Sequence, residues 1–237
     1  MLVRAALLFL AFVSLPAAAA PVDCVVLLHG LARTAGSMEK LATALRDHGY
    51  EVANVDYPSR HFGIAELAGL AIGEGLLRCD AVQAPKIHFV THSLGGILVR
   101  YYLKHDSIAN LGRVVMLAPP NHGSEVVNHF GQLPGYRLLN GPAGFELGTD
   151  ARSIPLQLGA VDYAVGVIAG TRSINPILSS VLSNPDDGKV SVQSARLDGM
   201  TDFLTVPASH PFIMRNAAVI SQVVHFLQTG TFRHGRP

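Results

Sequence analysis

The feature that most constrains the fold is an apolar run that ends in a turn containing a serine and continues into a helical pattern. The apolar residues 87–90 precede Thr91-His92-Ser93-Leu94-Gly95-Gly96, and residues 97–103 follow. This order predicts a strand, a tight turn and a helix, with Ser93 at the apex of the turn. Such an elbow lifts the serine hydroxyl clear of the sheet and points the first helix amides at it. A serine in this position acts as a nucleophile when a histidine takes its proton, or else only caps the helix.

A second turn follows the β-branched and leucine-rich run at residues 25–28. His29-Gly30-Leu31 ends that run, and a helical pattern extends from about residue 36 to residue 47. In a serine hydrolase, one oxyanion donor comes from this early loop and the other from the residue after the nucleophile. The expected donors are therefore the backbone N–H groups of Leu31 and Leu94. The alternative is an ordinary turn between a strand and a helix.

Strand-like and helix-like stretches alternate along the rest of the chain. Strands are expected near residues 25–28, 52–55, 86–90, 113–117, 164–169 and 203–206, and helices near 36–47, 65–78, 95–105 and 211–228. Strands of β-branched residues that alternate with helices imply parallel βαβ units with helices on both faces of the sheet. The predicted fold class is therefore α/β, with a doubly wound, mostly parallel sheet.

Residues 121–162 break this alternation. The segment is rich in glycine and proline, and it lies between two strands at their carboxyl-terminal edge, where open α/β sheets bind ligands. We expect a small cap or acyl-binding insertion in which Phe130 and Phe145 contact the acyl group. The alternative is a packed surface excursion that makes no substrate contact.

Several stretches of the chain together resemble the α/β-hydrolase superfamily, in a compact version, and more narrowly the small bacterial serine lipases and esterases. The resemblance covers nearly the whole chain after residue 22. One departure is Thr91, which stands where the usual Gly-x-Ser-x-Gly pattern has glycine. The stretches that carry the resemblance are Leu28-His29-Gly30-Leu31, Val55-Asp56-Tyr57-Pro58, Thr91-His92-Ser93-Leu94-Gly95-Gly96, Ala118-Pro119-Pro120-Asn121-His122-Gly123-Ser124 and Asp187-Gly188-Lys189-Val190.

The resemblance implies a histidine on the loop after the last strand and an acid on the loop after the strand before it. His210 follows the strand-like residues 203–206 and is the expected base. Asp186 and Asp187 both lie on the preceding loop. Asp187 is favoured because its spacing from His210 and the following glycine match the pattern of these lipases. An alternative for Asp186, Asp187 and Gly188 is a solvated turn.

The first twenty residues have the layout of a secretory signal peptide. Arg4 precedes an apolar stretch from residue 5 to residue 15, and Pro16 and four alanines follow. We expect cleavage near Ala19 or Ala20, which leaves residues 21–237 as an exported catalytic domain, periplasmic or secreted. The apolar stretch is too short to span a bilayer comfortably, so an uncleaved anchor is the less favoured alternative.

The two cysteines lie at the expected start of the first strand and end of the second helix. Strand starts and the ends of preceding helices share one edge of a doubly wound sheet, so Cys24 and Cys79 can meet there. Export makes a disulfide chemically allowed. The alternative is two buried free thiols.

These expectations combine into one mechanism. His210, oriented by Asp187, removes the proton of Ser93 as Ser93 attacks a carboxylic ester, and the resulting acyl-enzyme is hydrolysed. No zinc-ligand spacing or phosphate-binding loop is present, so no cofactor or metal is expected. The formal net charge of +1 gives no reason to expect a nucleic-acid partner. The expected substrate is a small-molecule or lipid ester, and transient membrane or lipid contact stays open.

Other functions fit the same residues. An acyltransferase, a thioesterase or an amidase would use the same triad, because a fold does not determine its substrate. A catalytically silent, hydrolase-like binding protein would lack a triad member.

Overall fold

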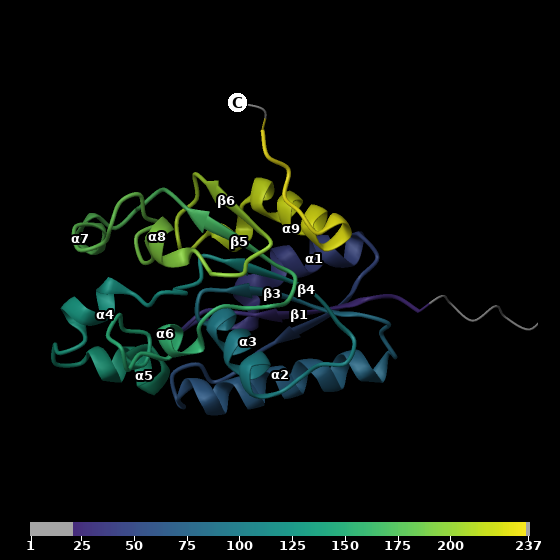
Figure 1. Ribbon diagram of the computed structural model, residues 1–237, viewed down its shortest axis with the longest axis horizontal. Helices are drawn as coiled ribbons and strands as arrows, with labels where there is room; N and C mark the ends of the chain where they lie inside the picture. Colours follow the sequence, from purple (N-terminus) through teal and green to yellow (C-terminus); the bar gives the residue numbers. More distant parts are fainter. Residues whose placement is uncertain (1–20, 236–237) are drawn as a thin grey trace, which may run out of the picture.

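The apolar runs form one parallel sheet in the computed structural model, which describes residues 21–235 (Figure 1). The strands lie in the order β2-β1-β3-β4-β5-β6, and every neighbouring pair is parallel. The carboxyl-terminal ends of all the strands therefore meet at one edge of the sheet. The strands are β1 (Cys24–Leu28), β2 (Glu51–Val55), β3 (Ile87–His92), β4 (Leu111–Leu117), β5 (Val165–Gly170) and β6 (Asp202–Val206).

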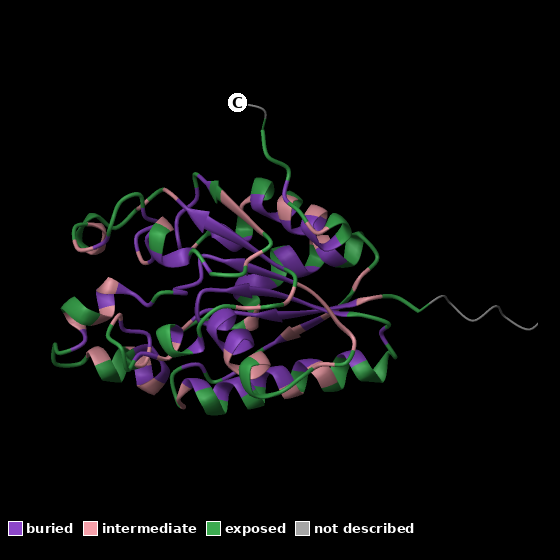
Figure 2. Cartoon of the chain, in the orientation of Figure 1, coloured by how far each residue is buried: buried purple, intermediate pink, exposed green. Residues whose placement is uncertain are grey.

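Each face of the sheet is covered by its own layer of helices. On β1, Val26 and Leu28 pack in the core beneath α2 (Ile64–Ala81) and α3 (Leu94–His105). The alternate residues Val25 and Leu27 pack on the opposite face, beneath α1 (Glu39–Asp47) and α9 (Ala217–Thr229). The strands are consequently buried between two helical layers whose outer surfaces are exposed (Figure 2). The predicted fold class is confirmed.

The last helix starts later than the sequence pattern indicated. We expected helix from residue 211, but a short 3₁₀ turn at Ile213–Arg215 comes first and α9 begins at Ala217. The Asn216 side chain accepts hydrogen bonds from the amides of Ala218 and Val219, which makes it the N-cap. Residues 211–212 belong instead to the loop that carries His210.

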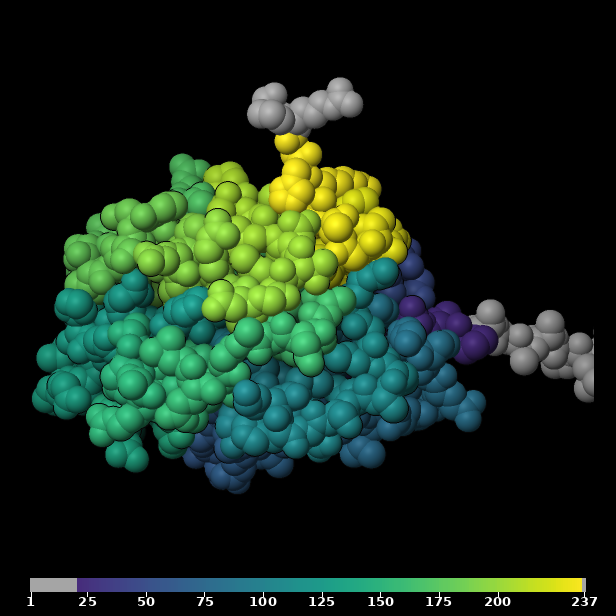
Figure 3. Space-filling view, in the orientation of Figure 1, coloured from purple at the N-terminus to yellow at the C-terminus, as the bar shows by residue number. Residues whose placement is uncertain are grey.

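The segment of residues 121–162 contains helices that its glycine and proline content concealed. These are α4 (Glu125–Phe130), α5 (Tyr136–Phe145) and α6 (Ile154–Leu158), and α5 is kinked where Gly141 has φ 66° before Pro142. The segment lies beside α7 (Pro176–Ser179) and α8 (Val192–Ala195) at one end of the molecule (Figures 1 and 3).

A buried arginine anchors that segment to α3. The Arg100 guanidinium, on α3, donates hydrogen bonds to the carbonyl groups of Asn121, Pro155 and Gly159. Arg100 is only 3% exposed, and burial lowers its pKa to about 10. Because these bonds join both ends of the segment to α3, the segment is an anchored part of the fold.

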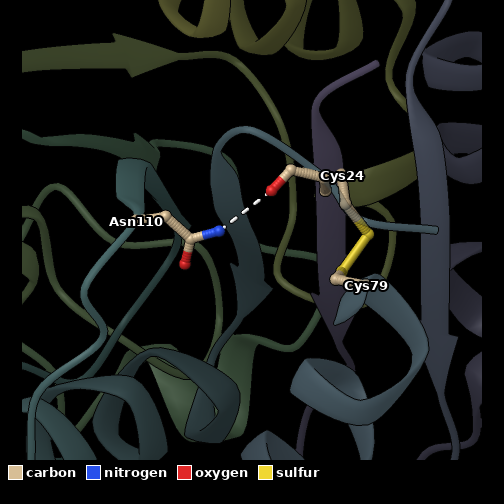
Figure 4. The surroundings of a disulfide bond; sticks show 4 residues. Cys24, Cys79 and Asn110 are labelled. Carbon is tan, nitrogen blue, oxygen red and sulfur yellow. Dashed lines mark hydrogen bonds between the residues drawn. A yellow bond between two sulfur atoms is a disulfide. The ribbon is translucent and has the colours of Figure 1, made fainter. Parts of the chain in front are cut away.

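Cys24 and Cys79 form a disulfide, and the alternative of two free thiols is wrong. The bond joins the start of β1 to the last turn of α2, with the two Cα atoms 5.6 Å apart (Figure 4). Nearby, the Asn110 side-chain amide donates a 3.0 Å hydrogen bond to the carbonyl of Ala84. The disulfide therefore lies at the amino-terminal edge of the sheet, opposite the edge where the carboxyl-terminal ends of the strands meet.

The predicted signal peptide, residues 1–20, lies outside the described residues. Within residues 21–235, no helix combines the length and apolar character that crossing a membrane requires.

Candidate active site

The predicted elbow forms between β3 and α3. Ser93 has φ 53° and ψ −118°, a conformation that residues other than glycine rarely adopt and that surrounding structure must enforce. The turn packs tightly, because a Cβ on Gly30 would lie 2.7 Å from Nδ1 of His92 and one on Gly95 would lie 2.7 Å from the carbonyl oxygen of Leu28. These glycines allow the two predicted turns to touch, which brings Ser93 against the loop after β1.

The departure at Thr91 is accommodated by Gly96. Thr91 is fully buried, and a Cβ on Gly96 would lie 3.3 Å from its Oγ1 atom. A side chain at residue 96 would therefore press on the threonine. The Thr91 hydroxyl has no hydrogen-bond partner among the described residues.

Ser93, His210 and Asp187 come together at the carboxyl-terminal edge of the sheet. Nε2 of His210 lies 3.1 Å from Oγ of Ser93, and Nδ1 of His210 lies 2.8 Å from Oδ2 of Asp187. The side chains come from three separate loops, after β3, β5 and β6. The exposed fractions are 8% for Ser93, 6% for His210 and 1% for Asp187, so the carboxylate is screened from solvent while the serine is reachable.

The two candidate acids have different surroundings. The Oδ1 atom of Asp187 accepts hydrogen bonds from the amides of Lys189 and Val190, which leaves Oδ2 for His210. Asp186 instead accepts from the amide of Gly188 and from the hydroxyl of Ser179. Asp186 thus shapes the loop, and Asp187 is the carboxylate that contacts the histidine.

His92 is a neighbour of the site whose contact the sequence pattern did not reveal. Its Nε2 atom donates a 3.1 Å hydrogen bond to the backbone carbonyl of His210, while its Nδ1 atom is buried without a partner. Burial lowers the pKa of His92 well below the usual value, so the ring is neutral. In the sequence, only the position of His92 directly before Ser93 indicated that it lies near the site.

The backbone amides of Leu31 and Leu94 are both free. Within the described part of the chain, neither donates a hydrogen bond, although neighbouring amides are occupied. The turn that holds Leu31 is fixed by a hydrogen bond from the Ala32 amide to Ser59 and by one from the Tyr57 hydroxyl to the His29 carbonyl. No acceptor in the described part of the chain therefore occupies either donor, and Leu94 directly follows Ser93.

A cavity of about 320 Å³ opens onto Ser93, His210 and Asp187. The volume is at the lower end of the range for small-molecule sites, about 300–1,000 Å³. Its lining combines apolar and polar residues. The apolar lining residues include Leu31, Pro120, Val126, Val127, Tyr136 and Leu147, and the polar ones include Arg33, Ser124, Asn140, Asn175 and Lys189.

The residues 121–162 do contribute to this wall, but through different side chains from those expected. Phe130 and Phe145 do not line the cavity, and Phe145 is 41% exposed beside a separate hollow. The apolar lining residues of the segment are Val126 and Val127 on α4, Tyr136 at the start of α5 and Leu147 after it. The expectation for the two phenylalanines was wrong because hydrophobicity alone does not tell which side of a short helix faces the cavity.

Comparison with known proteins agrees with the fold. The model of the alpha/beta hydrolase family matches residues 25–225, and the chain therefore belongs to that family. No curated protein sequence matches this chain.

Solved structures of lipases and related proteins share the architecture. The mature lipase BlEst2 of Bacillus licheniformis has a TM-score of 0.68 and 18% identity, over 88% of this chain and 93% of that one. The lin2722 gene product of Listeria innocua has a TM-score of 0.62 and 15% identity, over 90% and 96%. Lipase B of Aspergillus fumigatus has a TM-score of 0.66 and 14% identity, over 87% and 52%. At these identities the similarity shows the fold alone.

Proposed function

We propose that this protein hydrolyses carboxylic esters with Ser93 as nucleophile, His210 as general base and acid, and Asp187 as the group that orients His210. The observation that carries the proposal is the continuous hydrogen-bonded line from Ser93 Oγ through His210 to Asp187, at 3.1 and 2.8 Å. Membership of the alpha/beta hydrolase family adds support.

The reaction proceeds in two halves. Ser93 Oγ forms a bond to the acyl carbon as its proton passes to Nε2 of His210. The tetrahedral intermediate then expels the alcohol, which takes the proton from the imidazolium. Water repeats the sequence on the acyl-enzyme, with His210 as base, and releases the carboxylic acid.

The free amides of Leu31 and Leu94 stabilise the oxyanion in this scheme. Each would donate a hydrogen bond to the negative oxygen that develops in both tetrahedral intermediates. Loss of a single donor of this kind typically costs about 10²–10³ in kcat. Because both donors are backbone groups, their side chains need no particular chemistry.

The positive charge on His210 is balanced by Asp187. Asp187 is almost fully buried and already accepts two backbone hydrogen bonds, so its carboxylate is fixed before the reaction begins. A preorganised carboxylate of this kind holds the imidazole tautomer that leaves Nε2 free to accept a proton.

A panel of 4-nitrophenyl esters of increasing acyl length tests the proposal. The wild-type protein should release nitrophenol, and Ser93→Ala should lose several orders of magnitude in kcat/KM while it keeps its fold by circular dichroism. Ser107→Ala, an exposed serine beyond the far end of α3, is the matched control. Retention of more than a tenth of the activity by Ser93→Ala would reject Ser93 as the nucleophile.

We also propose that the protein is exported after cleavage near Ala19 or Ala20. The disulfide between Cys24 and Cys79 supports this location, since such bonds persist in oxidising compartments. The intact mass of the protein from the periplasmic, secreted and membrane fractions tests the cleavage. A full-length mass in the membrane fraction would contradict it.

A further inference from the structure

Lys189 presents an unpaired cation to the cavity beside the candidate triad. Its backbone is fixed, because its amide donates to Asp187 Oδ1 and its carbonyl accepts from the Ser124 hydroxyl. The residue lines the cavity. Within residues 21–235, its ammonium group has no hydrogen bond or ion pair with the protein. The ammonium group of this cavity-lining residue therefore keeps three N–H donors that no described residue uses.

Arg33 is a second cationic residue that lines this cavity, from a different loop; it is exposed, and it also lines the neighbouring surface hollow. It lies two residues after Leu31, and its backbone amide donates to the Gly30 carbonyl, which fixes the turn. Its guanidinium also makes no hydrogen bond or ion pair with the described residues. Arg33 and Lys189 thus line the cavity that contains Ser93, and they come from the two loops that carry the candidate oxyanion donor and the candidate acid.

The carboxylates nearby already have other partners. Asp187 is the acidic residue that lines this cavity, and its two oxygens are taken by His210 and by two backbone amides. Asp56, in the adjoining surface hollow, accepts from the Ala35 amide and lies 3.4 Å from Nε2 of His29.

The two cations affect each other through the cavity. Burial is the main cause that lowers the pKa of Lys189, and the positive charge of Arg33 lowers it further. The negative charge of Asp187 raises this pKa and so opposes both effects. Like charges that line one cavity repel each other, and an anion bound between them would relieve that repulsion. Arginine and lysine bind carboxylate or phosphate oxygens through charge-assisted hydrogen bonds.

We propose that the ester substrate carries an anionic group, a carboxylate or a phosphate, which binds between Arg33 and Lys189. This inference rests on the proposed ester hydrolysis. The apolar wall formed by Val126, Val127 and Leu147 accommodates the hydrocarbon part of the same substrate. The pairing selects substrates by charge, independently of acyl length.

Two matched substrate pairs test this proposal. The first compares the mono-4-nitrophenyl ester of adipic acid with 4-nitrophenyl hexanoate, and it places a carboxylate on the acyl side. The second compares 1-butyrylglycerol 3-phosphate with 1-butyrylglycerol, and it places a phosphate on the alcohol side. The wild-type protein should favour the anionic member of at least one pair by roughly tenfold or more in kcat/KM, mainly through KM. The pair that shows the preference identifies both the anion and its side of the ester.

The preference should depend on the two cations. Lys189→Met and Arg33→Met should each lower the ratio of anionic to neutral kcat/KM about tenfold, and Lys189→Arg should retain most of it. Raised salt should weaken the preference, because ions screen it. Lys86→Met, which removes the same charge at the opposite edge of the sheet, is the matched control and should leave the ratio unchanged.

The outcomes separate this inference from the function on which it rests. If neutral esters are cleaved by the wild type and not by Ser93→Ala, but neither pair shows a preference for the anion, the inference is wrong and the ester hydrolase stands. A preference that survives both methionine substitutions also overturns the inference. If the protein cleaves no ester of either pair and none of the nitrophenyl panel, both proposals fail.

Discussion

Asp187 holds His210 at two points. Its Oδ2 atom lies 2.8 Å from Nδ1 of the imidazole, and its backbone carbonyl accepts the His210 amide at 2.9 Å. The His210 carbonyl in turn accepts a hydrogen bond from His92. The imidazole is thus fixed through both its ring and its backbone before any substrate binds.

Asp187→Asn should therefore harm ester hydrolysis far more than Asp186→Asn. An amide at residue 187 can donate to Nδ1 and stabilise the wrong tautomer, a change that costs about 10⁴ in kcat in a serine triad. Among the described residues the Asp186 side chain accepts hydrogen bonds only from Gly188 and Ser179, so its replacement should leave kcat within about tenfold, the effect of about one hydrogen bond. Steady-state kinetics on one short ester decide between them, and equal small effects would place the acid elsewhere.

The apolar wall of the cavity should set the preference for acyl length. Val127→Ala and Leu147→Ala widen the wall, and one methylene of pocket contact is typically worth ~1–3 kcal/mol. Both variants should therefore change the ranking of short against longer esters. Phe130→Ala, on the same segment but outside the cavity lining, is the matched control and should not change it. If all three variants lowered kcat/KM for every ester by one common factor, the segment would only support the fold.

Thr91→Val should stabilise the protein. The substitution keeps the shape of the side chain and removes a buried hydroxyl that has no hydrogen-bond partner, a feature that costs roughly 1–3 kcal/mol. The melting temperature should rise by about 2–4 °C for each kcal/mol gained. Thr91→Gly, which restores the family's usual residue, should instead destabilise the fold, because it empties space that Gly96 leaves for the threonine. A lower melting temperature for Thr91→Val would contradict this reading of the elbow.

Stability should fall as the solution is acidified from pH 7.5 to 5.5. Burial lowers the pKa of His29, His88 and His92 below the usual 6.5. In that range the unfolded chain binds protons that the folded protein does not, so the stabilising contribution is complete above about pH 6.5 and is lost as the pH falls through it. His92 alone should remove about 1 kcal/mol of unfolding free energy by pH 5.5. Urea denaturation at the two pH values measures the difference, and equal or greater stability at pH 5.5 would contradict it.

The sequence was most informative for residues whose position follows from the order of strands, turns and helices. Ser93 was recognisable because a strand, a tight turn and a helix follow one another in a short stretch, and His210 because a loop after the last strand is required by the fold. The fold brings Nε2 of His210 within 3.1 Å of Oγ of Ser93, and the catalytic roles of both residues stay predictions. The acid was harder to select, because Asp186 and Asp187 are adjacent and only the direction of their side chains distinguishes them.

The remaining features depend on contacts between distant parts of the chain. In the sequence Arg100 is an ordinary helix residue. In the structure it anchors residues 121–159 to α3 by donating hydrogen bonds to three backbone carbonyls. The helix α5 was missed because its glycine and proline residues suggest loop, and α4 was missed because six residues are too few to show a helical period. Lys189 belongs to one of the stretches that carry the family resemblance and Arg33 lies just after another, but that both line one cavity follows from the packing of two loops.

Covalent labelling with a fluorophosphonate tests most directly whether Ser93 is the nucleophile of an ester hydrolase. We expect a single adduct per protein molecule, located by peptide mass spectrometry on Ser93, with ester hydrolysis lost in proportion to labelling. Ser93→Ala and His210→Gln should not be labelled at a comparable rate, since a serine without its base is a weak nucleophile. Stoichiometric labelling at another residue, or full ester hydrolysis by protein in which Ser93 is completely labelled, would contradict the proposed mechanism.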